Sequence, residues 1–206
     1  RGTGIPDREV GANSGKSRLT VIETIYIEEA VRSHPRTSEI LARFPGARRI
    51  RCHRYGEVFN PRDQDFRIQK RRPALILAEK FKNFVLPAPE GFGIGGSENF
   101  YFSHMLNCLY DCRYCFLQGM YQSAHYVMFV NHESFMDAID KRLEETKESQ
   151  TVTFFSGYDC DSLALESVTG FVKAFLPFFR ERPRALLELR TKSVRVQELL
   201  KTEPFE

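Results

Sequence analysis

Hydrophobic and polar residues follow one another along this chain in the pattern of short strands separated by helices. Runs rich in β-branched and aromatic residues predict strands at residues 21–27, 48–53, 99–105, 126–130, 151–155 and 184–190. Helices are expected at residues 37–44, 116–122, 134–148, 162–180 and 194–201. Repeated strand–helix units imply a parallel sheet with right-handed crossovers. The predicted fold class is therefore α/β.

Turn and capping residues place the ends of several elements. Thr37 or Ser38 is expected to cap the first helix, because hydroxyl side chains satisfy the free N–H groups there. A loop is expected at residues 60–65, and the Gly- and Pro-rich residues 87–96 form a linker. Residues 162–180 are expected to form one long helix.

The pattern divides the chain into three parts. Residues 1–17 are rich in Gly, Ser and charge without periodicity, which predicts a disordered leader. Residues 18–95 are expected to form a small α/β module that ends in the linker. Residues 96–206 hold about three strong strand–helix units, fewer than a closed barrel needs. We expect a partial (β/α) barrel, truncated or completed by another chain.

Composition supports a packed core and shows an uneven distribution of charge. The 206 residues are 42 % hydrophobic, and no apolar run is long enough for a membrane-spanning helix. Residues 1–107 carry 18 Lys and Arg against 12 Asp and Glu, whereas residues 108–206 carry 12 against 15. The basic residues cluster at Arg43, Arg48, Arg49, Arg51 and Arg54, and at Arg67, Lys70, Arg71 and Arg72. Such clusters either follow a phosphate backbone or form solvated faces.

Three of the five cysteines lie within eight residues, at Cys108, Cys112 and Cys115. Cysteine thiolates are the usual ligands of 4Fe–4S clusters, and this C-x3-C-x2-C spacing can hold three irons. The fourth iron would stay open to bind a substrate or cofactor, as the open position of a catalytic zinc does. Free cysteines without a signal peptide favour a reducing, cytoplasmic location.

Zinc binding is the main alternative for these cysteines. His104 lies four residues before Cys108, so His104 and the three cysteines could form a Cys3His site. Zinc modules usually use C-x2-C knuckles in pairs, and the sequence has no second pair. Simple burial of three neighbouring thiols is a third explanation.

Two further segments are expected beside the cysteine loop, because ligands of parallel sheets bind at the carboxyl ends of the strands. Residues 156–161 and Thr191 with Lys192 follow predicted strands. Ser156 and Gly157 would allow a cofactor to approach the backbone closely. Asp159 and Asp161 are expected to bind a ribose or to cap the following helix, and capping is the better role for Asp161.

The cysteine loop with Tyr114 resembles that of the radical S-adenosylmethionine (SAM) enzymes. In that superfamily the amino and carboxylate groups of SAM chelate the open iron, and an electron from the cluster cleaves SAM to a 5′-deoxyadenosyl radical. The resemblance places Tyr114 near the adenine and Lys192 beside the SAM carboxylate.

Flanking segments extend the resemblance, over roughly residues 20–200, to the spore photoproduct lyase family. These segments are Cys115–Gln118, Tyr126–Asn131, Asp161–Glu166, Leu189–Lys192 and Ile25–Glu29. The family repairs a thymine dimer in DNA as a carbon–carbon lyase. The resemblance therefore implies DNA as substrate and a reductant such as flavodoxin or ferredoxin.

Two positions depart from the family pattern. Tyr158 stands where the family has a hydrogen-donating cysteine, with Cys160 two residues later, and Phe116 stands where the family has a tyrosine. Tyr158 and Cys160 are therefore the candidate hydrogen donors. A radical SAM relative that acts on another nucleic acid, a peptide or a metabolite stays open as an alternative, as does a zinc-stabilised nucleic-acid-binding module.

Overall fold

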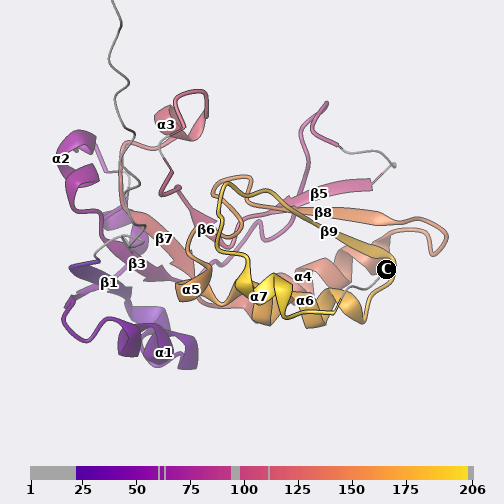
Figure 1. The fold of residues 1–206 in the computed structure, drawn as a ribbon, viewed down its shortest axis with the longest axis horizontal. Helices are drawn as coiled ribbons and strands as arrows, with labels where there is room; N and C mark the ends of the chain where they lie inside the picture. The colour runs from indigo at the N-terminus through magenta and orange to yellow at the C-terminus, as the bar shows by residue number, and fades with distance from the viewer. Residues whose placement is uncertain (1–21, 60, 63, 94–97, 111, 204–206) are drawn as a thin grey trace, which may run out of the picture.

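The strands of this protein form two sheets, and the chain passes repeatedly from one to the other (Figure 1). The computed structural model describes residues 22–59, 61–62, 64–93, 98–110 and 112–203. The predicted leader, residues 1–17, and part of the predicted linker lie outside the described residues.

The first sheet is parallel except at one edge, where β6 runs antiparallel to β7. Its strands, in spatial order, are β2 (Arg48–Cys52), β1 (Thr24–Glu28), β3 (Leu75–Ala78), β7 (Tyr126–Phe129) and β6 (Met105–Leu106). The second sheet has β4 antiparallel and the rest parallel. Its order is β4 (Leu86–Pro87), β5 (Glu98–Phe102), β8 (Val152–Ser156) and β9 (Ala185–Leu189). The mixed α/β fold with parallel strands is confirmed. The barrel stays a prediction.

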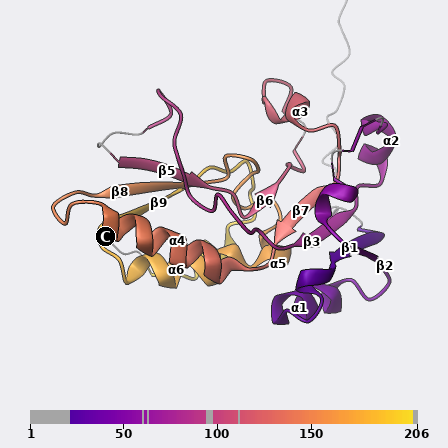
Figure 2. The ribbon, with the colours of Figure 1, turned by 180° about the vertical axis from the view of Figure 1, so that it is seen from behind.

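Helices cover one face of each sheet, as Figures 1 and 2 show. The helices are α1 (Pro35–Arg43), α2 (Phe66–Arg71), α3 (Leu117–Met120), α4 (His132–Glu145), α5 (Glu166–Thr169), α6 (Phe171–Arg180) and α7 (Gln197–Leu200). The longer helices α4 and α6 pack on the second sheet, and α1 packs on the first. The short helices α2 and α3 lie together at the other end of the first sheet.

Aromatic side chains fill the layer between the second sheet and its helices. Phe102 on β5 lies 5.3 Å from Phe175 and 6.1 Å from Phe171 on α6, measured between ring centres. Phe135 on α4 joins them, and all four rings are buried. Rings of this size contribute most of the apolar area in such a core. This layer supports the second sheet, which contains β8 and β9.

The two predicted units contribute strands to the same sheet. Strand β3, from residues 18–95, pairs in parallel with β7, from residues 96–206, with Leu75 opposite Tyr126. The chain passes from β5 in the second sheet to β6 in the first through Ser103 and His104. The division at residue 95 stays a prediction about the sequence, and strand pairing crosses it.

Several helix ends differ from the sequence-based expectation. The side chain of His34 accepts a hydrogen bond from Arg36 N at 3.2 Å, so His34 rather than Thr37 or Ser38 caps α1. Pro35 follows at the first helical position, where its missing N–H costs nothing. The predicted helix over residues 162–180 is two helices, α5 and α6, because Gly170 adopts a left-handed φ of +60° between them.

Strand β3 and helix α2 are among the elements that have no counterpart in the sequence-based prediction. Strand β3 is four buried apolar residues, too short to show a period. Helix α2 begins where Asp65 Oδ1 accepts a hydrogen bond from Ile68 N at 3.0 Å, directly after the predicted loop. The sequence pattern indicates only a cluster of basic residues at this position.

Candidate functional site

A cavity of about 360 Å³ lies where the cysteine loop faces the carboxyl ends of β8 and β9. The loop side consists of Cys108, Tyr110, Cys112, Tyr114, Cys115, Phe116 and Leu117. The facing side consists of Gly157, Tyr158, Cys160, Asp161, Arg190, Thr191 and Lys192, and Phe92 completes the wall. The structure therefore brings together the three segments that the strand ends had indicated.

The cysteine loop exposes three free thiols to this cavity. Cys108, Cys112 and Cys115 are each partly exposed. Local hydrogen bonds shape the loop: Cys115 N donates to Cys112 O at 2.9 Å, and Gln118 Nε2 donates to Tyr110 O at 3.1 Å. Burial raises the pKa of the Cys108 thiol to about 11, so it is protonated at neutral pH when it binds nothing.

Among the described residues, no three His, Cys, Asp or Glu side chains converge to hold a single metal ion. A four-iron cluster places its cysteine sulfurs farther apart than one ion does, because each sulfur binds a different iron. Three thiols around one open cavity have the donor chemistry and the room that such a cluster requires.

The turn after β8 depends on Gly157, which adopts a φ of +82°. A Cβ at this position would lie 2.6 Å from Ser162 Oγ and 2.8 Å from Ser162 N. The preceding Ser156 is buried, its hydroxyl 2.8 Å from Ser162 Oγ, and it donates to Glu188 O on β9. Ser156 is absent from the cavity wall, so it joins β8 to β9 instead of approaching a cofactor.

Asp161 connects the turns that follow β8 and β9. Its carboxylate accepts hydrogen bonds from Leu163 N at 2.9 Å, Thr191 Oγ1 at 2.7 Å and Lys192 N at 2.5 Å. Leu165 occupies the N-cap position of α5, and its side chain makes no capping hydrogen bond. The expectation that Asp161 caps the helix is therefore wrong; it caps a turn and fixes the backbone of Lys192.

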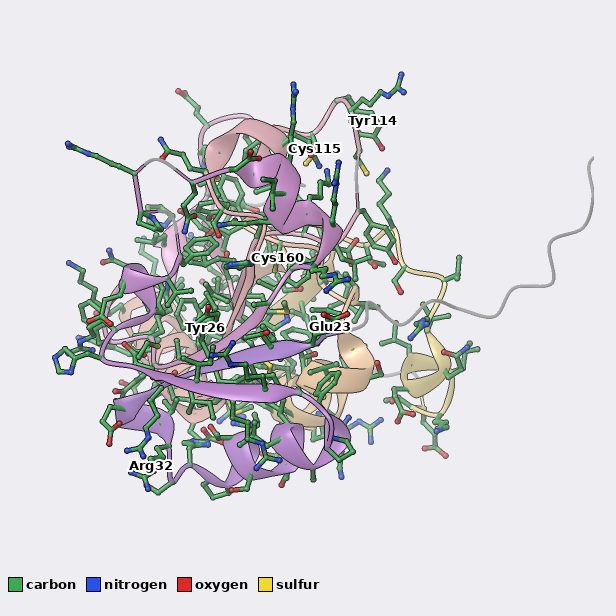
Figure 3. All side chains as sticks on the ribbon, turned by 90° about the vertical axis from the view of Figure 1, so that its left-hand side faces the viewer. Glu23, Tyr26, Arg32, Tyr114, Cys115 and Cys160 are labelled. Atoms are coloured by element: carbon green, nitrogen blue, oxygen red, sulfur yellow. The ribbon has the colours of Figure 1, made fainter. Side chains whose placement is uncertain are left out.

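Lys192 and Tyr114 lie together at the mouth of the cavity. The ammonium Nζ of Lys192 is 5.3 Å from the Tyr114 ring centre, and a hydrogen bond to the Tyr114 hydroxyl raises the pKa of Lys192. Tyr114 is 79 % exposed, so one face of its ring is free to stack on a planar group. In Figure 3, Tyr114 points outward beside Cys115, while Cys160 lies deeper in the molecule.

The two candidate hydrogen donors differ in their surroundings. Tyr158 lies in an aromatic group on the cavity wall, with ring-centre distances of 4.3 Å to Tyr101, 5.6 Å to Phe116 and 6.0 Å to Phe92. Cys160 also borders the cavity but is only 4 % exposed, and burial raises the pKa of its thiol well above the usual range.

Asp159 is absent from the cavity wall. Burial raises the pKa of its carboxyl, and hydrogen bonds with the side chains of Ser103 and Tyr121, together with nearby Lys80, oppose that rise. The contact of Asp159 with a ribose stays a prediction.

His104 does not join the cysteines. It is fully buried, with its ring centre 4.4 Å from Phe171 and 6.3 Å from His132, and burial lowers its pKa to about 3. It is absent from the cavity wall. The alternative Cys3His zinc site is therefore not formed among the described residues.

Sequence reasoning missed two residues of the cavity wall. Phe92 comes from the predicted linker, and Arg190 Nη2 donates to Phe92 O at 3.1 Å, which brings the linker to the site. The Arg190 guanidinium also lies 4.5 Å from the centre of the Phe155 ring and pairs with Glu188. No sequence signal connects residues so far apart along the chain.

Comparison with known proteins gives one family match. The family model described as spore photoproduct lyase matches residues 97–204, just over half of the chain. No curated protein matches the sequence. No helix among the described residues is long and apolar enough to cross a membrane.

Solved structures of spore photoproduct lyase resemble this chain in fold. A cysteine-to-serine variant matches with a TM-score of 0.73 at 18 % identity, over 87 % of this chain and 52 % of the solved one. A variant with bound AdoMet and dinucleoside spore photoproduct gives the same values. A complex with dinucleoside spore photoproduct matches with a TM-score of 0.72 at 18 % identity, over 88 % and 53 % of the two chains. The chain thus spans about half the length of these structures. At 18 % identity, the similarity shows a shared fold and nothing more.

Proposed function

This chain belongs to the spore photoproduct lyase family, and we propose that it is a radical SAM enzyme that holds a 4Fe–4S cluster on Cys108, Cys112 and Cys115. The observation that carries the proposal is the shared cavity. Three free thiols on one side face Lys192 and the turn after β8 on the other, with space between them. When bound, the cluster would supply the electron that cleaves SAM to a 5′-deoxyadenosyl radical.

The chain's own residues would bind and orient SAM. Lys192 supplies a positive charge for a carboxylate, and Asp161 holds the Lys192 backbone in place. The exposed ring of Tyr114 offers a stacking face for an adenine. Gly157 keeps the turn after β8 compact beside them. Ser156 and Asp159 act as supports of this turn.

Tyr158 is our candidate for the residue that returns a hydrogen atom to a substrate radical. Its phenol lies on the cavity wall, whereas Cys160 is buried and Phe116 has no O–H. In this step the O–H bond breaks, the hydrogen atom joins the substrate carbon, and a tyrosyl radical remains. That radical returns to tyrosine when it takes one electron from a low-potential reductant such as flavodoxin or ferredoxin and one proton from water.

The proposed substrate is a thymine-dimer lesion in DNA. Its support is the family match together with the similar solved structures that contain dinucleoside spore photoproduct. Another nucleic acid, a peptide or a metabolite is the alternative, because Tyr158 and Phe116 replace the family's cysteine and tyrosine. We also propose a cytoplasmic location, and a partial (β/α) barrel over residues 96–206 that follows an α/β module at residues 18–95.

Anaerobic assay of SAM cleavage tests this proposal. The protein is purified without oxygen, reduced with dithionite and given SAM, and 5′-deoxyadenosine is measured with and without thymine-dimer DNA. We expect 5′-deoxyadenosine in both assays and more of it with the lesion. Equal amounts would remove the lesion as substrate. A colourless protein loaded with one zinc ion, and no 5′-deoxyadenosine, would refute the radical SAM assignment.

A further inference from the structure

Asn107, the residue directly before the first cysteine of the loop, has a left-handed backbone conformation. Its φ is +71°, and among the described residues Asn83 is the other non-glycine residue with a positive φ. A left-handed backbone costs free energy in any residue with a Cβ, although asparagine tolerates it better than most. Asn107 is also buried, with 7 % of its surface exposed. Surrounding contacts must therefore stabilise this conformation.

Four hydrogen bonds provide these contacts. The backbone N of Asn107 donates to Asp159 O at 2.9 Å, in the turn after β8. The side-chain Nδ2 donates to Ser123 O at 2.7 Å and to His125 O at 3.1 Å, in the segment that leads into β7. The side-chain Oδ1 accepts from Cys108 N at 2.9 Å. The amide thus binds the cysteine's backbone on one side and the lead-in to β7 on the other.

The segment that receives the Asn107 amide is itself held from outside. Gln69 Oε1 on α2 accepts hydrogen bonds from Ser123 Oγ at 3.2 Å and from Ala124 N at 2.9 Å. The contacts therefore run from α2 through residues 123–125 to Asn107 and end at Cys108. Neither Gln69 nor Ser123 borders the cavity, so these contacts leave the ligand space free.

Within the described part of the chain, the backbones of Cys112 and Cys115 make no such hydrogen bond outside the loop region. Cys112 and Cys115 are joined to each other by a bond within the loop, and Cys115 O accepts from Gln118 N at 3.1 Å. These bonds shape the turn, and the side chains of Tyr114 and Phe116 reach Lys192 and Tyr158 on the facing wall.

From this arrangement we infer that Asn107 is the positioning residue of the cysteine loop. It fixes the backbone of Cys108 in the metal-free protein, whereas the backbones of Cys112 and Cys115 are held by hydrogen bonds within the loop. The role as a cluster site rests on the proposed function, but the fixed position of Cys108 does not. Asn107 acts through Cys108 and touches no ligand itself.

Thiol reactivity in the metal-free protein tests the inference. Each cysteine is alkylated with iodoacetamide, and its rate is read from peptide mass spectrometry. In Asn107→Gly, glycine keeps the left-handed backbone and removes the three side-chain hydrogen bonds. We expect the rate at Cys108 to rise about tenfold and the rates at Cys112 and Cys115 to change less than about twofold, since local opening becomes easier only where contacts are lost.

Asn83→Gly is the matched control, because Asn83 has a φ of +56°, is exposed and lies outside the cavity wall. It should leave all three rates unchanged. Gln69→Ala removes the outer contact alone and should raise the Cys108 rate about threefold. It also serves as the second variant if Asn107→Gly does not fold. An unchanged Cys108 rate in a folded variant, or an equal rise at all three cysteines, would overturn the inference.

A spectroscopic readout separates this inference from the proposed function. In cluster-loaded Asn107→Gly we expect an altered electron paramagnetic resonance signal of the reduced protein upon addition of SAM, and a normal signal in Asn83→Gly. If the wild-type protein assembles no cluster, the proposed function fails while the Cys108 result stands. If the cluster forms and the alkylation rates do not discriminate, the inference fails alone.

Discussion

The two walls of the cavity are held in different ways. The turn after β8 is fixed by side chains that bond to other strands, with Ser156 reaching Glu188 and Asp161 reaching Thr191 and Lys192. Beyond Asn107, the backbone hydrogen bonds of the cysteine loop lie within the loop, and the side chains of Tyr114 and Phe116 reach Lys192 and Tyr158 on the facing wall. The wall expected to orient SAM is therefore preformed by hydrogen bonds between separate chain segments. The wall expected to bind metal depends on bonds within itself and on side-chain contacts.

Removal of one thiol should produce the largest effect. It should change cluster binding and SAM cleavage and leave the stability of the fold unchanged. We expect Cys112→Ala to lower SAM cleavage at least about 100-fold, because a missing ligand leaves one iron without a protein thiolate. Iron and sulfide analysis with the 5′-deoxyadenosine assay measures this. The metal-free protein should keep its melting temperature, because the loop contributes few contacts to the fold.

Cys52→Ala is the control, since Cys52 is buried at the end of β2 and absent from the cavity wall. It should retain iron and SAM cleavage. A Cys112→Ala protein with full iron content and normal cleavage would remove this cysteine from the ligand set.

Substitution of Asp161 should act on the preformed wall and reduce stability. Asp161→Asn replaces one carboxylate oxygen by an NH2 group facing an N–H or O–H donor, which we expect to lower the free energy of unfolding by about 3 kcal/mol. Urea unfolding measures this. SAM affinity should fall as well, because Lys192 loses its backbone anchor. Asp137→Asn, at an exposed position of α4, should change neither quantity. Unchanged stability in Asp161→Asn would show that this wall is not held by the carboxylate.

The smallest expected effect is the pH dependence of the unfolding free energy that comes from Glu166, at the start of α5. Burial raises the pKa of this carboxyl from 4.5 to about 7, although Val172 N donates to it at 3.1 Å. The folded state therefore binds the proton more tightly than the unfolded state. Its stabilisation is complete below pH 4.5 and is lost as the pH rises through 7.

From pH 5 to pH 6, unfolding free energy should fall by about 1 kcal/mol more in the wild-type protein than in Glu166→Gln, which cannot ionise. Urea unfolding at both pH values measures the difference. Glu144→Gln, an exposed change on α4, should behave like the wild type. A wild-type protein as insensitive to pH as Glu166→Gln would show that Glu166 does not titrate in this range.

Local spacing made part of the site predictable from sequence. Cys108, Cys112 and Cys115 lie in one loop, and their spacing predicts a 4Fe–4S site without knowledge of the fold. The meeting of this loop with residues 156–161 and Lys192 followed from a general rule about parallel strands. These predictions depend on residues that lie close together in the sequence or directly after a predicted strand.

Long-range contacts made the rest unpredictable. His104 lies near the cysteines in sequence, but the bend between β5 and β6 buries it against Phe171. Asp161 and Asp159 are two residues apart, and only the fold shows that one fixes Lys192 while the other faces Lys80. Asn107 has no recognisable motif. Its role arises from backbone carbonyls at positions 123 and 125, which no side-chain pattern reveals.

The pairing of β3 with β7 has a consequence for how such a chain can change over generations. The cysteine loop leaves and returns to one sheet, between β6 and β7, while the partners of β7 come from residues that precede the loop. A recombination break at residue 95 would separate two strands that share a buried interface. Exchange of either part as a module would therefore leave a buried strand without its partner.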